Sequence, residues 1–354
     1  MSGPDGFAER LIDWQRSHGR HALPWQNTRD PYRVWLSEIM LQQTQVTTVL
    51  GYYARFLERF PDVDALAAAS LDEVLGLWSG LGYYSRARHL HACARAVVAR
   101  HGGRFPQSSR ELMDLPGIGR STAAAIAAFC FAERVAILDG NVKRVLARLL
   151  AFEGDLALAR EERRLWEHAT ALLPERDMDR YTQGLMDLGA TVCSARAPAC
   201  PLCPVQGLCA AARAGNPQRY PIKTRKLRRG QREHVWLWLA RRDQIWLVQR
   251  PATGIWAGLW SLPEFESAAA FEAVSSGWPG SAEALPSFTH VLTHLDWRLH
   301  PVRWTLPDPL PAPLPGSLEA AWPAGRWFDV EAALAAGLPA PLRKLLTQQL
   351  AATR

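Results

Sequence analysis

Leu115-Pro116-Gly117-Ile118-Gly119-Arg120-Ser121-Thr122 is the stretch of this sequence that says most about the fold. It joins a short apolar segment to an alanine-rich segment, expected to be helical over residues 121–131, through two glycines within three residues. Such a turn can point backbone N–H groups at a phosphate near the N-terminus of the following helix. Most two-glycine turns only cap helices, so the motif by itself is weak evidence for phosphate binding.

The segment VAILDGNVKR at residues 135–144 strengthens the case that this turn has a function beyond capping a helix. It is an apolar run that ends in one carboxylate, Asp139, where another helix is expected to begin. Aspartate is a favoured N-cap residue, so a purely structural role would explain it. The same Asp139 side chain can cap the helix and also take part in a reaction.

A second carboxylate, Glu38, lies within YRVWLSEIMLQQT at residues 32–44. Its helical neighbours three and four positions away are Val34, Trp35, Leu41 and Gln42, of which three are apolar. Partial desolvation on such a face raises the pKa of a carboxyl and lets it hold a proton near neutral pH, as a general acid requires. A glutamate at the edge of an amphipathic helix is the structural alternative.

Four of the six cysteines follow the pattern Cys-x6-Cys-x2-Cys-x5-Cys and are candidate metal ligands: Cys193, Cys200, Cys203 and Cys209. Prolines between them stiffen the turns that would aim several thiolates inward. Four thiolates suit an iron-sulfur cluster or a structural zinc, and the single Cys-x2-Cys pair favours iron modestly. Cys93 and Cys130 lie in apolar stretches and are expected to be ordinary buried thiols.

The bulk composition is that of a soluble globular chain. Its 354 residues are 48% hydrophobic, which favours two domains, and its net charge of +7 favours polyanionic partners. The apolar stretches are too short to cross a membrane, and the N-terminus does not resemble a secretory signal. We therefore expect a cytoplasmic protein without disulfides, associated with the nucleoid if it is bacterial.

The pattern of elements changes near residue 213. Before it, helical signals recur at residues 31–50, 71–77, 86–100 and 121–131. Residues 213–233 are rich in arginine, lysine and proline and are expected to form an exposed basic linker. Beyond it, residues 234–240 and 245–250 flank a turn, residues 288–300 alternate in places, and residues 330–350 look helical. The sequence predicts a mainly α-helical domain over 1–212 and an α+β domain over 234–354, with proline-rich surface loops such as 307–315.

Together, the glycine turn, the LDGNV segment and the four cysteines resemble the helix-hairpin-helix DNA glycosylase superfamily that includes endonuclease III. The resemblance spans nearly all of the first 212 residues. Within it, LPW at 23–25, WLSEIMLQQTQV at 35–46 and GLGYYSRA at 80–87 resemble the adenine glycosylases of the MutY family. The resemblance implies a helix-hairpin-helix glycosylase fold with an iron-sulfur loop, in which the four cysteines hold a 4Fe-4S cluster.

The resemblance also implies a substrate and a reaction. The partner would be double-stranded DNA in which adenine is mispaired with 8-oxoguanine or guanine, and the adenine would be flipped out of the stack before excision. Glu38 would protonate the leaving adenine, and Asp139 would stabilise the oxocarbenium-like sugar or form a transient covalent link to it. Bifunctional relatives carry a lysine nucleophile where this chain has Ser121, so strand cleavage should be inefficient and the enzyme monofunctional.

Further positions acquire roles through the same resemblance. Gln43 would wedge into the duplex, with Thr44, Leu81 and Tyr83 near the base opposite, although a tyrosine that follows a glycine is more often a core or loop aromatic than a stacking residue. The adenine pocket would comprise Trp25, Leu41 and Gln183, and some relatives have glutamate at the position of Gln183 and arginine at that of Gln26. The implied DNA contacts also include Gly117, Gly119, Ser121, Asn141 and Lys143.

The segment GIWAGLWSLP at residues 254–263 resembles the opening of a Nudix-like domain. A hydrolytic Nudix domain would carry an Arg-Glu-x-x-Glu-Glu helix, whereas residues from Ser267 onward are alanine-rich, so we expect a recognition module without hydrolase activity. Residues 292–294, LTH, stand where relatives have Phe-Ser-His in a loop that reads 8-oxoguanine. Thr293 and His294 would keep the hydrogen bonds, and Leu292 would lose the aromatic stacking.

Other functions fit parts of the sequence. A glycosylase-lyase for oxidised pyrimidines would share the fold and the cluster, and a DNA-binding or redox-sensing module would use the basic segment and the cysteines. A nucleotide pyrophosphohydrolase would rest on the last domain alone. We expect a monomeric adenine glycosylase.

Overall fold

The computed structural model describes residues 6–224, 229–309 and 318–353, which form two compact units. The first unit comprises the described residues within Met1–Ala67 and Ala92–Lys226, and the second those within Ala68–His91 and Leu227–Arg354. Residues 68–91 thus belong to the second unit, although they precede most of the first in sequence. The predicted domain limits at residues 212 and 234 stay a prediction.

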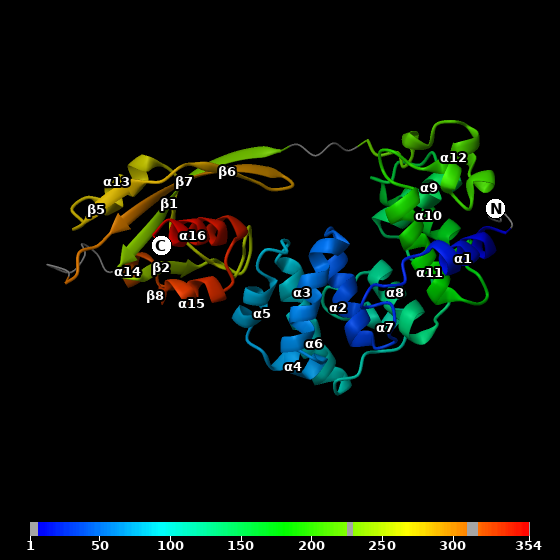
Figure 1. Cartoon of the computed structure of the whole chain (residues 1–354), viewed down its shortest axis with the longest axis horizontal. Coiled ribbons are helices and arrows are strands. Elements are labelled where there is room, and N and C mark those ends of the chain that lie inside the picture. Colours follow the sequence, from blue (N-terminus) through cyan, green and yellow to red (C-terminus); the bar gives the residue numbers. More distant parts are fainter. Residues whose placement is uncertain (1–5, 225–228, 310–317, 354) are drawn as a thin grey trace. The chain divides into compact units, whose positions relative to one another are not determined.

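The first unit is built from helices, as predicted (Figure 1). Residues such as Leu11, Val142, Leu146 and Leu185 form its buried core. In the described residues, no helix is both long and apolar enough to span a membrane. The helices that lie wholly or partly in this unit are α1 (Phe7–His18), α2 (Pro31–Leu41), α3 (Val46–Arg59), α4 (Val63–Ala68), α6 (Ser85–His101), α7 (Ser109–Leu112), α8 (Arg120–Phe131), α9 (Gly140–Leu149), α10 (Ala159–Ala171), α11 (Met178–Asp187) and α12 (Ala210–Arg213).

The apolar run at residues 31–50 forms two helices rather than the single helical stretch expected. Proline at the first position and the Asp30 side chain, whose Oδ1 accepts the Tyr32 N–H at 2.9 Å, start α2. The helix ends at Leu41, and Gln43 then adopts a left-handed conformation with φ 56°. Such a conformation is strained for glutamine and is often found at functional sites. The break exposes Gln43 and separates α2 from α3.

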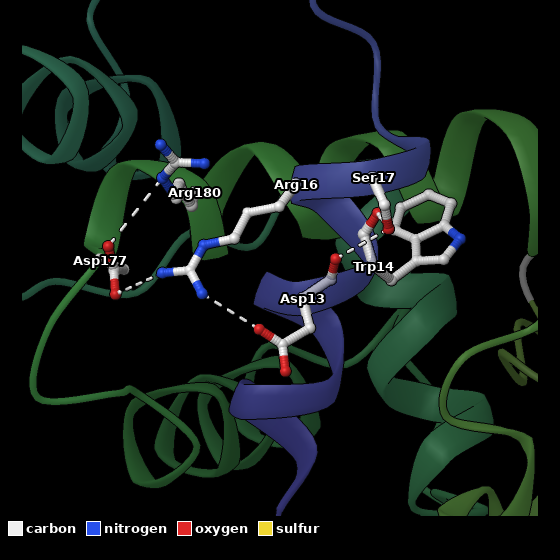
Figure 2. A network of polar contacts seen from close by, with 6 residues as sticks. All are labelled: Asp13, Trp14, Arg16, Ser17, Asp177 and Arg180. Carbon is white, nitrogen blue, oxygen red and sulfur yellow. Dashed lines mark hydrogen bonds and ion pairs between the residues drawn. The ribbon is translucent and has the colours of Figure 1, made fainter.

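An ion-pair network ties α1 to the start of α11 (Figure 2). Arg16 lies between two carboxylates, with Nη1 at 3.1 Å from Asp13 Oδ1 and Nη2 at 3.2 Å from Asp177 Oδ2. Asp177 precedes α11 in a left-handed conformation, and Arg180 Nε lies 4.0 Å from its Oδ1. These groups are partly exposed, so the network contributes less than about 1 kcal/mol per pair. Its effect is to fix the entry of α11, a helix that lines the site described below.

The second unit contains one mixed sheet, in line with the predicted α+β class. The sheet order is β3-β2-β1-β7-β5, with β4 on β1, β6 on β7 and β8 on β2. Strands β1 and β7 run parallel side by side (Figure 1), and the other pairs are antiparallel. The strands are β1 (Gly230–Arg241), β2 (Gln244–Gln249), β3 (Trp260–Ser261), β4 (Glu264–Phe265), β5 (Ser281–Ala284), β6 (Phe288–Val291), β7 (Leu295–Thr305) and β8 (Gly325–Asp329).

Helices complete the second unit: α5 (Leu71–Trp78), the start of α6, α13 (Ala268–Ser275), α14 (Leu318–Ala321), α15 (Val330–Ala335) and α16 (Ala340–Thr353). Three element boundaries in the structure differ from those predicted from the sequence. β1 begins at Gly230, the 288–300 stretch divides at residues 292–294, and the 330–350 helix breaks at residues 336–339. Arg225, Lys226 and Arg228 of the predicted linker, and positions 310–315 of the proline-rich loop, lie outside the described residues.

Candidate functional site

A cavity of about 1310 Å³ opens in the first unit between the ends of several helices. The C-terminal end of α2, the N-termini of α8 and α9, and α11 contribute to its walls. Nine of the predicted site residues line it: Trp25, Glu38, Leu41, Gln43, Thr44, Ser121, Asp139, Asn141 and Gln183. The structure therefore brings together both predicted catalytic carboxylates and the three predicted adenine-pocket residues.

Glu38 is a partly buried side chain on the cavity wall. Val34 and Trp35 beside it on α2 are fully buried, as the helical spacing predicted. Burial, assisted by the nearby negative charge of Asp139, raises the pKa of Glu38 to about 8. Glu38 thus holds a proton at neutral pH, so the predicted protonated carboxyl is present.

Asp139 combines a structural and an electrostatic role. Its Oδ1 accepts the Val142 N–H at 2.7 Å and so caps α9, as the sequence indicated. Burial raises the pKa of Asp139, while the backbone N–H groups of Val142 and Asn141 and the charges of Arg144 and Lys143 act in the opposite direction. Burial outweighs these opposing effects, so the pKa of Asp139 is raised on balance, as is that of Glu38.

The glycine turn presents the N-terminus of α8. Gly117 has φ 76°, a conformation that favours glycine, and Leu115 and Ile118 anchor the turn in the core while both glycines are exposed. Gly119 caps α8 without a side-chain hydrogen bond. The first N–H groups of the helix are therefore available to an anion such as a phosphate.

Ser121, in the first turn of α8, tethers the segment that leads to Asp139. Its Oγ accepts the Leu138 N–H at 3.0 Å, one residue before Asp139. The side chain at this position on the cavity wall is a hydroxyl and carries no amine.

Two predicted DNA contacts on α9 have protein partners. Lys143 Nζ lies 2.7 Å from Glu162 Oε1, and Asn141 Oδ1 accepts a hydrogen bond from Arg144 Nη2 at 2.9 Å. Lys143 does not line the cavity, whereas Asn141 and Arg144 do. Arg144 was not predicted, and its position five residues after Asp139 carries no recognisable signal by itself.

The four predicted cysteine ligands line one small apolar cavity in the first unit. Arg148 of α9 holds the loop around it: Nη1 donates to Cys193 Sγ at 3.3 Å and to Ser194 O at 2.7 Å, and Nη2 donates to Ala195 O at 2.9 Å. Burial raises the pKa of Cys203 to about 11. Within the described residues, no group of three or more His, Cys, Asp or Glu is placed to hold a single metal ion.

The two remaining cysteines, both within the described residues, lie apart from this cavity. Cys93 is fully buried, as expected, whereas Cys130 is only partly buried. Burial raises the pKa of each thiol to about 12.

Four predicted recognition residues lie in the second unit. Tyr83 is 45% exposed and left-handed with φ 48°, and its hydroxyl lies 3.2 Å from Thr293 Oγ1. Thr293 and His294 are exposed in the turn between β6 and β7. Leu81 is only 5% exposed, which leaves little of its surface for contact with DNA.

The segment GIWAGLWSLP forms part of the core of the second unit. Trp256 is left-handed with φ 55° and stacks on Trp297 of β7, with ring centroids 4.7 Å apart. Arg250 pairs with Glu264 and lies over both indole rings. The following helix, α13, has the sequence AAAFEAVS and carries one carboxylate, Glu272.

Two family models match the chain. One, described as HhH-GPD superfamily base excision DNA repair protein, covers residues 36–169, and the other, described as NUDIX domain, covers residues 234–348. Both agree with the helix-hairpin-helix and Nudix-like classes predicted from the sequence.

Known proteins extend this match over almost the whole chain. The adenine DNA glycosylase of Buchnera aphidicola subsp. Baizongia pistaciae is 34% identical over 348 residues, which cover 97% of this chain and 96% of that protein. The adenine DNA glycosylase of Mus musculus is 45% identical over 214 residues, 58% of this chain and 41% of that protein.

Among solved structures, a thermostable thymine-DNA glycosylase superposes with a TM-score of 0.54 at 30% identity, over 59% of this chain and 95% of that one. A non-covalent endonuclease III–DNA complex gives a TM-score of 0.50 at 21% identity, over 59% of this chain and 94% of that one, and shows the shared fold. The chain belongs to the adenine DNA glycosylase family and is an enzyme of base excision DNA repair.

Proposed function

We propose that the chain is a monofunctional glycosylase that removes adenine mispaired with 8-oxoguanine or guanine from double-stranded DNA. The observation that carries this proposal is the pair of carboxyls, Glu38 and Asp139, on the wall of one cavity, with the pKa of Glu38 raised to about 8. The cavity can receive a base only after that base leaves the duplex stack, which is the strategy of base-flipping enzymes.

In the proposed reaction, Glu38 donates its proton to the adenine ring and makes the base a better leaving group. As the N-glycosidic bond breaks, positive charge develops on the sugar, and the Asp139 carboxylate stabilises it. The adenine leaves with the bonding electron pair and the transferred proton. Water then adds to the sugar carbon and gives up one proton, which returns Glu38 to its protonated form, and an abasic site remains. Ser121 supports the monofunctional assignment, because a hydroxyl tied to the Leu138 N–H cannot form a Schiff base.

DNA contacts are assigned to both units. The N-terminus of α8, with Gly117 and Gly119, would bind a phosphate together with Lys143 once DNA displaces Glu162. Gln43, exposed and left-handed beyond α2, suits the wedge, with Thr44 beside it. In the second unit, Tyr83, Thr293 and His294 would contact the base opposite adenine. We assign catalysis to residues 1–212, recognition to 234–354, and the connection to 213–233, in a monomer.

The function is tested with duplexes that contain A:8-oxoguanine, A:G or A:T, and with one that contains an oxidised pyrimidine. We expect abasic product from the first two and strand breaks only after alkali. Cleavage of the oxidised-pyrimidine duplex without alkali, or no release of adenine from either mispair, would contradict the proposal and favour a glycosylase-lyase.

We propose that Cys193, Cys200, Cys203 and Cys209 hold a 4Fe-4S cluster. The donor set fits, because four thiols line one apolar cavity and cysteine thiolates are the ligands that hold such clusters. The raised pKa of Cys203 means that this thiol ionises on binding the metal. The cluster would stabilise the cysteine loop, and the catalytic steps would belong to Glu38 and Asp139.

Metal analysis of the purified protein should give about four iron atoms and four sulfides per chain. Cys203→Ser should lower the iron content and the melting temperature, whereas Cys130→Ser, outside the cysteine cavity, should change neither. One zinc atom per chain, or full iron content in Cys203→Ser, would refute the assignment.

The pH profile of excision should fall on the alkaline side. Glu38 must be protonated to act, so the single-turnover rate should be highest below the pKa of about 8 and should decrease tenfold per pH unit above it. At low pH the rate should fall again as Asp139 takes up a proton. Rates measured between pH 5 and 10 test this, and a rate that rises through pH 8 would contradict the role of Glu38.

A further inference from the structure

A buried carboxylate behind the cavity fixes one of the pocket residues. Asp187, at the last position of α11, is completely buried, and Gln183 lies one helical turn before it. Gln183 Nε2 donates to Asp187 Oδ1 at 2.8 Å. Arg20, another cavity-lining residue, donates to the same carboxylate from Nε to Oδ1 at 2.7 Å and from its backbone N–H to Oδ2 at 2.9 Å.

These contacts decide which way the Gln183 amide faces. An ionised carboxylate can only accept hydrogen bonds, so the NH₂ group of Gln183 must face Asp187. Asp187 forms an ion pair with Arg20, and each of its two oxygens accepts a hydrogen bond from that residue. Gln183 Oε1 is left on the other side of the amide, and within the described residues no hydrogen bond engages it. The cavity wall at Gln183 therefore offers an acceptor.

The side-chain amide of Gln26 is held in the opposite orientation. Its Oε1 accepts the Leu23 N–H at 3.2 Å, and its Nε2 is buried without a partner in the described part of the chain. Because this Nε2 is fully buried, Gln26 presents no donor to the cavity, whereas Gln183 presents an acceptor. Adenine carries an amino donor at N6 beside ring-nitrogen acceptors, whereas guanine has an acceptor oxygen at that position. Guanine would therefore set its O6 against Gln183 Oε1, two acceptors with no proton between them.

We propose that Asp187 is a positioning residue that holds Gln183 Oε1 toward the cavity, so that the pocket selects purines with a 6-amino group. The inference rests on the proposed adenine excision and adds to it the device that sets base selectivity. Asp187 acts only through Gln183 and Arg20. Its loss should therefore change the choice of base more than the chemistry of bond cleavage.

The test compares single-turnover excision of adenine with that of unsubstituted purine, which lacks the 6-amino group, each opposite 8-oxoguanine. In Asp187→Asn one acceptor is lost, and the Gln183 amide is no longer held in one orientation. The adenine-to-purine rate ratio should fall about fivefold, the value of one hydrogen bond of about 1 kcal/mol. Gln183→Leu should lower the ratio similarly, and the double variant should lower it no further than Gln183→Leu alone.

Glu161→Gln is the matched control, because Glu161 is also buried, pairs with Arg160 and Arg164, and does not line the cavity. The adenine-to-purine rate ratio of Glu161→Gln should equal that of the wild-type enzyme. Equal slowing of both bases by Asp187→Asn, or an unchanged ratio, would overturn the proposal. If a melting experiment shows that Asp187→Asn does not fold, the Gln183→Leu variant becomes the test. A wild-type adenine-to-purine rate ratio in Gln183→Leu would then overturn the proposal. A wild-type enzyme that excises purine but no adenine contradicts the proposed function itself.

Discussion

Glutamine in place of Glu38 is expected to reduce the single-turnover rate of adenine excision by about 10²- to 10⁴-fold, the range of a lost general acid. The substitution keeps the size and polarity of the side chain and removes only its proton-donating acidity. Glu38 lies on the cavity wall with its pKa raised to about 8, so most molecules at neutral pH carry the required proton. Excision is measured by alkali cleavage of an A:8-oxoguanine duplex.

Binding separates a catalytic loss from a structural one. Glu38→Gln should bind the mispair with nearly the wild-type Kd, because the neutral glutamine resembles the protonated acid. Glu133→Gln serves as the control: Glu133 is partly buried, accepts hydrogen bonds from Ser109 and lies outside the cavity, so excision should be unchanged. A Glu38→Gln enzyme within threefold of the wild-type rate would exclude this acid, and a parallel loss of binding would indicate a folding defect.

Short sequence motifs predicted those parts of the site whose structure depends only on residues adjacent in sequence. Helices begin at Pro31 and after Asp139 as expected, because a proline at the first position or a carboxylate cap is sufficient to mark a helix start. The glycine turn is equally local, since only its φ values and two buried apolar residues are needed. These local elements are sufficient to place both predicted catalytic carboxyls near helix ends.

The break after α2 could not be predicted in the same way. Apolar residues continue beyond it at Val46 and Val49, so the periodicity favours an unbroken helix. The chain instead turns at Gln43 through a left-handed conformation, with the Thr44 N–H bonded to Leu41 O at 3.2 Å. A conformation that is unfavourable for glutamine is kept by the surrounding fold, and a single sequence carries no signal for it.

Partners distant in sequence were missed for a related reason. Arg20 and Asp187 are 167 residues apart, and Tyr83 and Thr293 are 210 apart, so their hydrogen bonds exist only after the fold is complete. The i, i+4 spacing of Gln183 and Asp187 was visible, but it is common on helices and does not identify a pocket. The inclusion of residues 68–91 in the second unit depends on such contacts as well.

Asparagine in place of Asp139 should separate the two roles of this residue. Asparagine caps helices about as well as aspartate, so the melting temperature should stay close to that of the wild type. The negative charge that stabilises the sugar is lost, and excision should fall by about 10²- to 10³-fold, as when one electrostatic stabiliser is removed. Asp139→Ala loses the Val142 N–H hydrogen bond as well and should be destabilised by about 1 kcal/mol while being equally inactive.

The residual activity of Asp139→Asn carries a second readout. The charge of Asp139 contributes to the raised pKa of Glu38, so its removal should move the alkaline limb of the pH profile to a midpoint below about 8. Desolvation, the larger cause, remains in the variant and should keep that midpoint above the ordinary pKa of glutamate. An unshifted alkaline limb would mean that the two carboxyls do not interact across the cavity. A melting temperature as low as that of Asp139→Ala would instead assign the lost activity to the helix cap.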